Sequence, residues 1–275
     1  IMNAMKTAAL MAALMVLFGL LGGAIGGNSG MVLAFSVAVA INFGSYWFSA
    51  SIVLKMYKAR EVSEEEAPEL VQLIDVLRQK AGLPMPRVYV IPSDQPNAFA
   101  TGRNPDHAAV AVTSGIVSLL SKDELEGVIS HELAHIKHRD ILTSSIAATV
   151  AAAITLLARF GLFFGGNRDR GNMINSLLML ILAPLAAMLI QMAISRSREF
   201  AADLEGALIC GKPKALASAL QRLQQSAERI PMNANPSTAH MFIINPFSGA
   251  MTGIRNLFST HPSTELRVER LMAMR

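Results

Sequence analysis

Long uncharged runs alternate with segments of mixed polarity along this chain. A helix that crosses the hydrocarbon core of a bilayer needs about 20 apolar residues, with roughly 17–25 tolerated. Four runs without a charged residue meet this length: Thr7–Gly27, Met31–Leu54, Ile141–Ala158 and Ile174–Ile194. The pattern therefore predicts four transmembrane helices in two hairpins, the first of which turns through Gly26–Gly30.

Two of these runs have another interpretation. The first follows Lys6 and could be a cleaved signal peptide, but no small-residue cleavage site follows it and the second run begins almost at once. The third is rich in Ala and Thr and could be a buried core helix, although small residues also suit close helix packing in a bilayer. We therefore expect the first run to be an anchor and keep the third as the weakest span.

Basic residues mark the ends of the runs outside the hairpins. Cytoplasmic loops of membrane proteins carry an excess of Lys and Arg, so segments 57–140 and 195–275 are predicted to lie in the cytoplasm. The turn of the second hairpin, with Arg159, Arg168 and Arg170, has the opposite bias. The residues that support the orientation are Lys55, Lys58, Arg60, Lys137, Arg139, Arg196 and Arg198.

The predicted fold is a mainly α integral membrane protein with an α+β cytoplasmic domain and a small β-sheet. The two cytoplasmic blocks hold about 165 residues, a normal size for one domain. The second membrane hairpin would then split this domain in sequence. The expected parts are hairpin 1 at 1–55, the first cytoplasmic part at 56–140, hairpin 2 at 141–194 and the second cytoplasmic part at 195–275.

Local patterns predict the elements of the cytoplasmic blocks. Apolar residues at helical spacing predict helices over Glu64–Lys80, Pro213–Arg229 and Thr264–Met274. Alternation between turn-rich segments predicts a sheet of about three strands. A long surface loop, and a candidate lid, is expected at Pro231–Ser263. The expected strands are Arg87–Ile91, Asn97–Thr101 and Ala108–Thr113.

A further helix has a defined start. Ser121 and Glu124 have the Ser-x-x-Glu spacing of a capping box, in which each side chain accepts a hydrogen bond from a free backbone N–H. No Pro or cap residue interrupts the chain between this start and the third apolar run. We therefore expect one continuous helix that enters the bilayer.

Composition excludes several classes of protein. Hydrophobic residues make up 52% of the 275 residues and charged ones 16%, against roughly 25% charged in soluble domains. Mean hydropathy is +0.40. Cys210 is the only cysteine, so a disulfide scaffold is excluded and any metal must be bound by His and carboxylates. A net charge of +4 without a basic stripe, and few aromatic residues, argue against nucleic-acid binding.

The candidate chemistry lies in the sequence His131-Glu132-Leu133-Ala134-His135, on the capped helix. Residues four apart share a helix face, so both imidazoles can bind one zinc ion. Zinc lowers the pKa of a bound water toward about 7, and Glu132 lies close enough to remove its proton. The motif therefore predicts a hydrolytic zinc site.

A catalytic zinc needs a third protein ligand and one open position. His138 lies on nearly the same line as the other two and cannot complete a tetrahedron, while His107 and His240 are expected in loops. Glu199 begins the helix that follows the fourth run, so it would leave the same membrane surface beside the motif. We expect Glu199 to be the third ligand and Asp203, one turn further, to orient a zinc-bound histidine.

With these residues, the chain resembles the HtpX-type membrane zinc metalloproteases, relatives of the CAAX prenyl endopeptidases and of gluzincins generally. The resemblance covers nearly the whole length, although Ile1 before Met2 departs from the pattern. Beyond the four runs, it rests on Asn97-Ala98-Phe99-Ala100, on His131–His135, on Glu199 with Asp203, and on Thr260-His261-Pro262 followed by Arg267.

The resemblance implies a function and its surroundings. It implies an ATP-independent endopeptidase with one Zn²⁺ per chain, linked to envelope stress. It implies cleavage of damaged or misfolded membrane proteins at the cytoplasmic face of the bacterial inner membrane. Expected partners are such membrane proteins, unfolded polypeptides and the lipid bilayer, with no nucleic acid or nucleotide.

Two further site predictions complete the picture. The strand Asn97–Thr101, with Asn97, Ala98, Phe99 and Ala100, is expected to bind extended substrate by adding a strand. His261 has two open roles besides an ordinary helix-start histidine. It could stabilise the oxyanion, or it could occupy the open position of zinc in the resting enzyme.

Three rival functions differ from this prediction. An intramembrane site-two type protease would need an acidic residue within a span, but the third and fourth runs contain none. A transporter would need ionisable groups in its spans, and all four runs lack them. A non-catalytic zinc-binding membrane protein would have no need for Glu132. The sequence therefore favours the metalloprotease.

Overall fold

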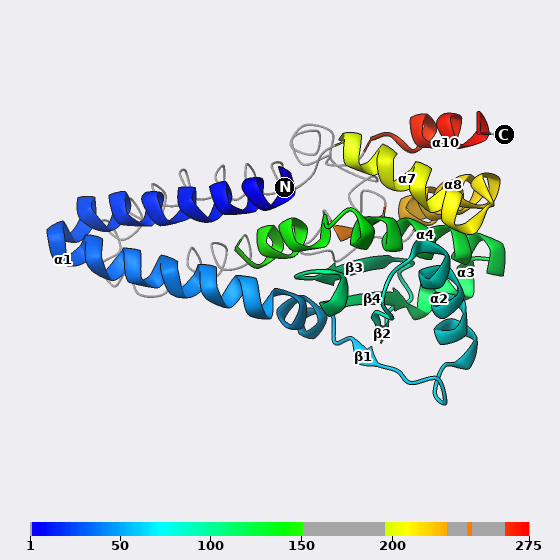
Figure 1. Cartoon of the computed structure of the whole chain (residues 1–275), viewed down its shortest axis with the longest axis horizontal. Coiled ribbons are helices and arrows are strands. Elements are labelled where there is room, and N and C mark those ends of the chain that lie inside the picture. Colours follow the sequence, from blue (N-terminus) through cyan, green and yellow to red (C-terminus); the bar gives the residue numbers. More distant parts are fainter. Residues whose placement is uncertain (1, 151–195, 230–240, 244–261, 275) are drawn as a thin grey trace.

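The computed structural model describes residues 2–150, 196–229, 241–243 and 262–274. A long helical hairpin projects from a body in which helices surround a small sheet (Figure 1). The helices are α1 (Met2–Met56), α2 (Pro68–Ala81), α3 (Ser114–Leu119), α4 (Lys122–Lys137), α7 (Arg196–Cys210), α8 (Pro213–Arg229) and α10 (Thr264–Met272), with a 3₁₀ turn at Pro105–His107.

Helix α1 folds back on itself at Gly27, as the sequence predicts. Gly27 has φ +61°, which an L side chain rarely adopts. A Cβ added at Gly22 would lie 2.3 Å from the carbonyl oxygen of Gly30, so the two arms approach as closely as glycine allows. Further along, the Asn42 amide donates a hydrogen bond to the carbonyl of Met11 (2.9 Å). Together these contacts close the first hairpin.

One helix in the described part of the chain is long and apolar enough to cross a membrane. This helix, Gly27–Met56, has a mean hydropathy of 1.6, and only 17% of its apolar window is buried. Many of its large apolar side chains, such as Leu33, Phe43 and Phe48, are exposed, as they are on a lipid-facing surface. Thr7–Leu20 and Ile141–Val150 are shorter apolar helices, and Ile174–Ile194 lies outside the described residues. The count of four spans therefore stays a prediction.

The sheet has four strands in the order β1-β2-β4-β3. Strand β2 pairs parallel with β4, while β1 and β3 pair antiparallel with β2 and β4. The sequence predicted three strands and missed β1, whose two residues are too few to show alternation. Among the described residues, strand β3 forms one edge of the sheet. The strands are β1 (Arg60–Glu61), β2 (Arg87–Ile91), β3 (Ala98–Gly102) and β4 (Ala108–Thr113).

Both faces of the sheet are covered. Successive side chains of each strand point to opposite faces, so the two faces belong to two separate hydrophobic cores. On one face, Val88, Ala100 and Val110 join the main core with α2, α4, α7 and α8. On the other face, Tyr89 and Phe99 pack with the end of α1 and with Ala148 of the apolar helix Ile141–Val150. The sheet therefore lies between the helical body and the base of the hairpin arm.

Helix α4 runs through the middle of the body and begins as predicted. The Ser121 hydroxyl accepts from the Glu124 N–H, and the Glu124 carboxylate accepts from the Ser121 N–H (2.8 Å). The capping box is therefore confirmed. Strand β3 and helices α2, α7 and α8 pack around α4 and bury most of its side chains.

The prediction that α4 continues into the bilayer is wrong. The helix ends at Lys137, His138 caps it, and Arg139 adopts φ +59° before a new helix begins at Ile141. The sequence does not indicate that the helix ends here. A left-handed position after a helix is usually occupied by glycine or asparagine, and here it is occupied by arginine. The two helices are therefore separate elements joined by a sharp turn.

The segment Pro231–Ser263 was expected to be a surface loop. Residues 241–243 of this segment are instead buried: Met241 belongs to the cluster formed by the sheet and the end of α1, and Phe242 packs against Tyr57. Met241 and Phe242 are apolar, so their burial against other apolar residues is favoured over exposure to water, and this explains the difference. Residues 230–240 and 244–261 lie outside the described part, so a lid stays a prediction.

Candidate active site

The motif residues lie on the buried side of α4. His131 and Glu132 are almost inaccessible, and the Glu132 residue retains 5% of its surface. His131 and His135 are one turn apart and their ring planes meet edge to face, with centroids 4.7 Å apart. The helical period therefore brings both imidazoles to the same cleft, as the sequence predicts.

Glu199 reaches these imidazoles from the first turn of α7. Its carboxylate oxygens lie 3.5 Å from His135 Nε2 and 3.8 Å from His131 Nε2, and the two Nε2 atoms are 3.1 Å apart. One ligand atom from each residue fits within 4.8 Å of the others. Tetrahedral zinc with bonds of about 2.0 Å holds its ligand atoms about 3.3 Å apart. The spacing and the donor set of two imidazoles and a carboxylate fit zinc.

His131 has a carboxylate on its other ring nitrogen. Asp203, one turn after Glu199 on α7, lies 3.0 Å from His131 Nδ1. The guanidinium of Arg267 donates two hydrogen bonds to Asp203 (2.8 and 2.7 Å) and one to the carbonyl of Ile243 (2.8 Å). Burial favours a neutral Asp203, but Arg267 outweighs it and holds the pKa of Asp203 well below its usual range.

Glu132 has the environment of a base that works near neutral pH. Burial raises the pKa of Glu132 to about 7, although His135 and the backbone N–H of Ala100 favour its ionised form. The Ala100 N–H donates to the Glu132 carboxylate at 2.8 Å. Edge strand β3 therefore holds one oxygen of Glu132 in place.

His135 contacts a second aspartate. Its Nδ1 lies 3.2 Å from Asp140, which follows the turn after α4. Burial disfavours the protonated ring, but Glu199, Asp140 and Glu132 outweigh it and raise the pKa of His135 to about 9. For His131, burial dominates and lowers the pKa. The two motif histidines thus differ in basicity.

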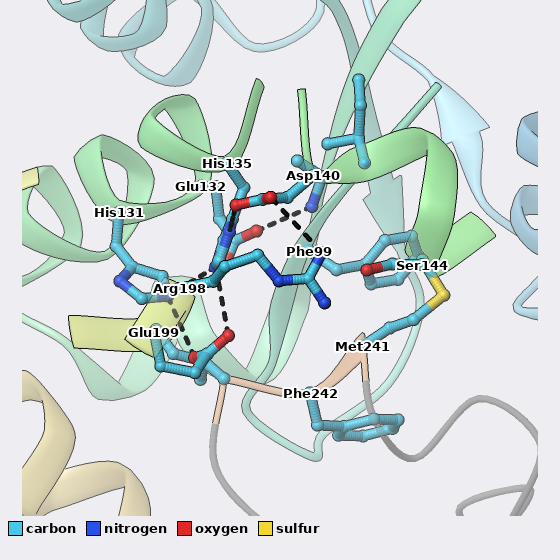
Figure 2. A pocket seen from close by; sticks show the side chains of 13 residues that line it. Phe99, His131, Glu132, His135, Asp140, Ser144, Arg198, Glu199, Met241 and Phe242 are labelled. Carbon is cyan, nitrogen blue, oxygen red and sulfur yellow. Dashed lines mark hydrogen bonds and ion pairs between the residues drawn. The ribbon is translucent and has the colours of Figure 1, made fainter. Parts of the chain in front are cut away.

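Most of the charged groups of the cleft gather around His135, while Phe99, Met241 and Phe242 lie on the other side together with Ser144 (Figure 2). Arg198 directly precedes Glu199 on α7, and its guanidinium points toward Asp140 (Figure 2). The apolar lining includes Phe99 and Ala100 of β3, Ile141, and the buried segment Met241, Phe242 and Ile243.

The structure brings most of the predicted site residues together. His131, Glu132, His135, Glu199 and Asp203 meet in one cluster, and Phe99 and Ala100 of the predicted substrate strand line the same cleft. Asn97 instead accepts a hydrogen bond from the N–H of Ile243 (3.3 Å). His261 lies outside the described residues, so both of its suggested roles stay predictions.

Sequence reasoning missed two polar residues at the site, Asp140 and Arg198. The sequence indicates them only as charges at the ends of membrane spans. Asp140 lies five positions after His135, a spacing at which a continuous helix would point it elsewhere. Only the turn at Arg139 brings it back to the ring.

Known proteins resemble this chain over nearly all of its length. A protease HtpX homolog of Salinibacter ruber is 64% identical over 99% of this chain and 98% of its own. Another protease HtpX homolog, of Methylibium petroleiphilum, is 57% identical over 100% of this chain and 98% of its own. The crystal structure of S. mikatae Ste24p shares the fold, with a TM-score of 0.53 and 19% identity, and covers 98% of this chain. This chain spans 64% of that protein.

A family model agrees with these similarities. The model of peptidase family M48 matches residues 64–275, which hold all of the residues that form the cleft. The matched region also includes the described cluster of two histidines and a glutamate. The chain therefore belongs to peptidase family M48 and is a membrane metalloprotease of the HtpX type.

Proposed function

We propose that this chain is a zinc-dependent endopeptidase in which His131, His135 and Glu199 hold the metal and Glu132 is the general base. One observation carries the proposal: the carboxylate of Glu132, with a pKa of about 7, lies in the same buried cleft as the three converging ligand atoms. A structural zinc site would use four protein ligands and no base.

Zinc bound there would polarise the scissile carbonyl and lower the pKa of a water molecule toward about 7. Glu132 takes the proton of the attacking water and later gives it to the leaving amine. The N–H of Ala100 fixes one oxygen of Glu132, so the other can face the water. Asp203, held by Arg267, orients the ring of His131 toward the metal.

We further propose that β3 pairs with an extended substrate. β3 is an edge strand, and Thr113 bonds to the carbonyl of Asn97, so in this antiparallel ladder Ala98 and Ala100 direct their backbone groups outward. The Ala100 N–H is already bonded to Glu132, which leaves the outward carbonyls as acceptors. A peptide N-methylated at a single paired amide should lose cleavage while its unmethylated parent is cut. Equal cleavage would contradict pairing.

The substrates and the location belong to the same proposal. Helix Gly27–Met56 and the turn into Ile141–Val150 support a cleft close to the membrane surface, because Ile141 lines it. We infer that damaged or misfolded membrane proteins enter it from the cytoplasmic face of the inner membrane. The division of the protease domain into segments 56–140 and 195–275 around a membrane hairpin is part of this proposal.

The decisive experiment replaces the base and keeps the ligands. We expect Glu132→Gln in detergent to bind one zinc per chain and to lose at least about 100-fold in casein cleavage, since it cannot accept the proton. Glu69→Gln, at an exposed position of α2, is the matched control and should leave activity unchanged. Full activity of Glu132→Gln would overturn the mechanism.

A further inference from the structure

We propose that Asp140 is a positioning residue for the metal site: it holds the ring of His135 from the side opposite the metal, and the left-handed turn at Arg139 puts it there. The inference rests on the proposed function for the identity of the metal. It assigns a role to a residue at the junction between α4 and the apolar helix Ile141–Val150.

The backbone after α4 follows a defined capping pattern. The Arg139 N–H donates to the carbonyl of Ile136 (3.0 Å), and the Asp140 N–H donates to the carbonyl of His135 (2.9 Å). With Arg139 in the left-handed region, this pair of bonds is a Schellman motif. The motif reverses the chain and returns Asp140 to the end of the helix that carries His135.

The side chain of Asp140 then contacts the same residue that its backbone contacts. One carboxylate oxygen lies 3.2 Å from His135 Nδ1, and the other lies 3.4 Å from the guanidinium of Arg198. Figure 2 shows Asp140 between the imidazole of His135 and Arg198. Only 5% of the Asp140 side chain is exposed. A buried carboxylate is costly unless it is paired, and His135 and Arg198 both line the same cleft.

Each of the two histidines therefore has a carboxylate close to its Nδ1 atom. His131 has Asp203 on Nδ1, and Arg267 holds Asp203. His135 has Asp140 on Nδ1, and Arg198 holds Asp140. A carboxylate on the second ring nitrogen fixes the tautomer with Nε2 free for the metal and increases its basicity. Since Ile141 follows Asp140 directly, the same residue ties the metal site to the apolar helix.

The first test removes the carboxylate. We expect Asp140→Ala to weaken zinc affinity about 10–100-fold, measured as zinc transfer to a chromogenic chelator from the full-length protein in detergent. The visible absorption of the cobalt-substituted protein should shift, because the ring of His135 is no longer held. Asp140→Asn keeps an acceptor oxygen and should lie between Asp140→Ala and wild type. Asp106→Ala, at an exposed aspartate, is the control.

The second test changes the turn and keeps Asp140. Glycine adopts φ +59° without steric strain, so Arg139→Gly should retain zinc like wild type. A β-branched side chain resists this conformation, so Arg139→Val should release zinc faster than Arg139→Gly. Melting of the metal-free proteins separates this effect from a general loss of folding.

The outcomes distinguish this inference from the proposed function. If Asp140→Ala and Arg139→Val keep wild-type zinc affinity and cobalt spectrum, the inference is overturned even if the wild type cleaves casein. If Glu132→Gln remains active, the mechanism fails, but the zinc measurements on Asp140 still decide the inference. If Asp140→Ala melts earlier without metal, the zinc affinities of Asp140→Asn and Arg139→Val decide.

Discussion

At the residue scale, two identical side chains in one motif have opposite acid–base properties. Burial controls His131 and lowers its pKa, whereas three carboxylates around His135 outweigh burial and raise its pKa to about 9. The Nε2 atoms face each other at 3.1 Å, so a proton on His135 Nε2 can be donated to His131 Nε2. A metal that binds here must displace that proton.

This proton predicts how zinc binding depends on pH. Zinc binds only neutral imidazole, and below about pH 9 the metal-free site holds a proton on His135. Apparent zinc affinity should therefore increase about tenfold per pH unit between pH 7 and 9 and level off above this range, in chelator competition corrected for the protonation of the chelator. An affinity that does not change over this range would contradict the assigned protonation.

At the element scale, the metal site depends on how closely α7 approaches α4. A Cβ added at Gly206 would lie 2.8 Å from the backbone nitrogen of His131 and 2.9 Å from its Cα. Only glycine permits this approach, because backbone atoms cannot move aside as a flexible side chain can. The contact sets the distance between the helix that carries Glu199 and the helix that carries both histidines.

Gly206→Ala should therefore damage both stability and metal binding. Overpacking of this kind costs about 1–3 kcal/mol in the free energy of unfolding, measured with denaturant in detergent. Zinc should also dissociate faster, because Glu199 moves away from the imidazoles. Leu204→Ala, at an exposed position of the same helix, is the control and should change little. Wild-type stability of Gly206→Ala would show that the helices separate at no cost.

At the scale of the whole molecule, the hairpin formed by α1 contacts the rest of the protein close to its aromatic residues Tyr46 and Trp47. The guanidinium of Arg103, in the β3–β4 connection, lies 4.6 Å from the ring centre of Trp47 on α1. Tyr46 packs against the same indole. Trp and Tyr concentrate where hydrocarbon meets lipid headgroups, and a guanidinium is poorly tolerated deeper. The β3–β4 connection should thus touch the membrane surface.

Trp47 is the only tryptophan of the chain, so its fluorescence can measure this depth. In phosphatidylcholine vesicles, quenchers attached near the headgroup should quench Trp47 more strongly than quenchers at the end of the acyl chain. The indole is 46% exposed in the structure, so lipid-borne quenchers can reach it. Stronger quenching from the bilayer centre would place Arg103 in hydrocarbon and contradict this orientation.

Much of the fold could be predicted because its signals are local. The capping box of Ser121 and Glu124, the strands Arg87–Ile91 and Ala108–Thr113 and the turn of the first hairpin occur where the sequence predicted them. Strand β1 was missed because two residues show no period. The continuous helix through Arg139 was wrong because residue type alone does not reveal a left-handed arginine.

The sequence by itself determined the motif pair, His131 and His135, because a helix repeats every 3.6 residues and so places residues four apart on one face. It also named Glu132, Glu199 and Asp203. Only the tertiary structure decided that Asp140 turns back to His135, that the Ala100 N–H holds Glu132, and that Arg267 reaches Asp203 from α10. These contacts join elements distant in sequence or depend on one unusual backbone angle, and packing sets both.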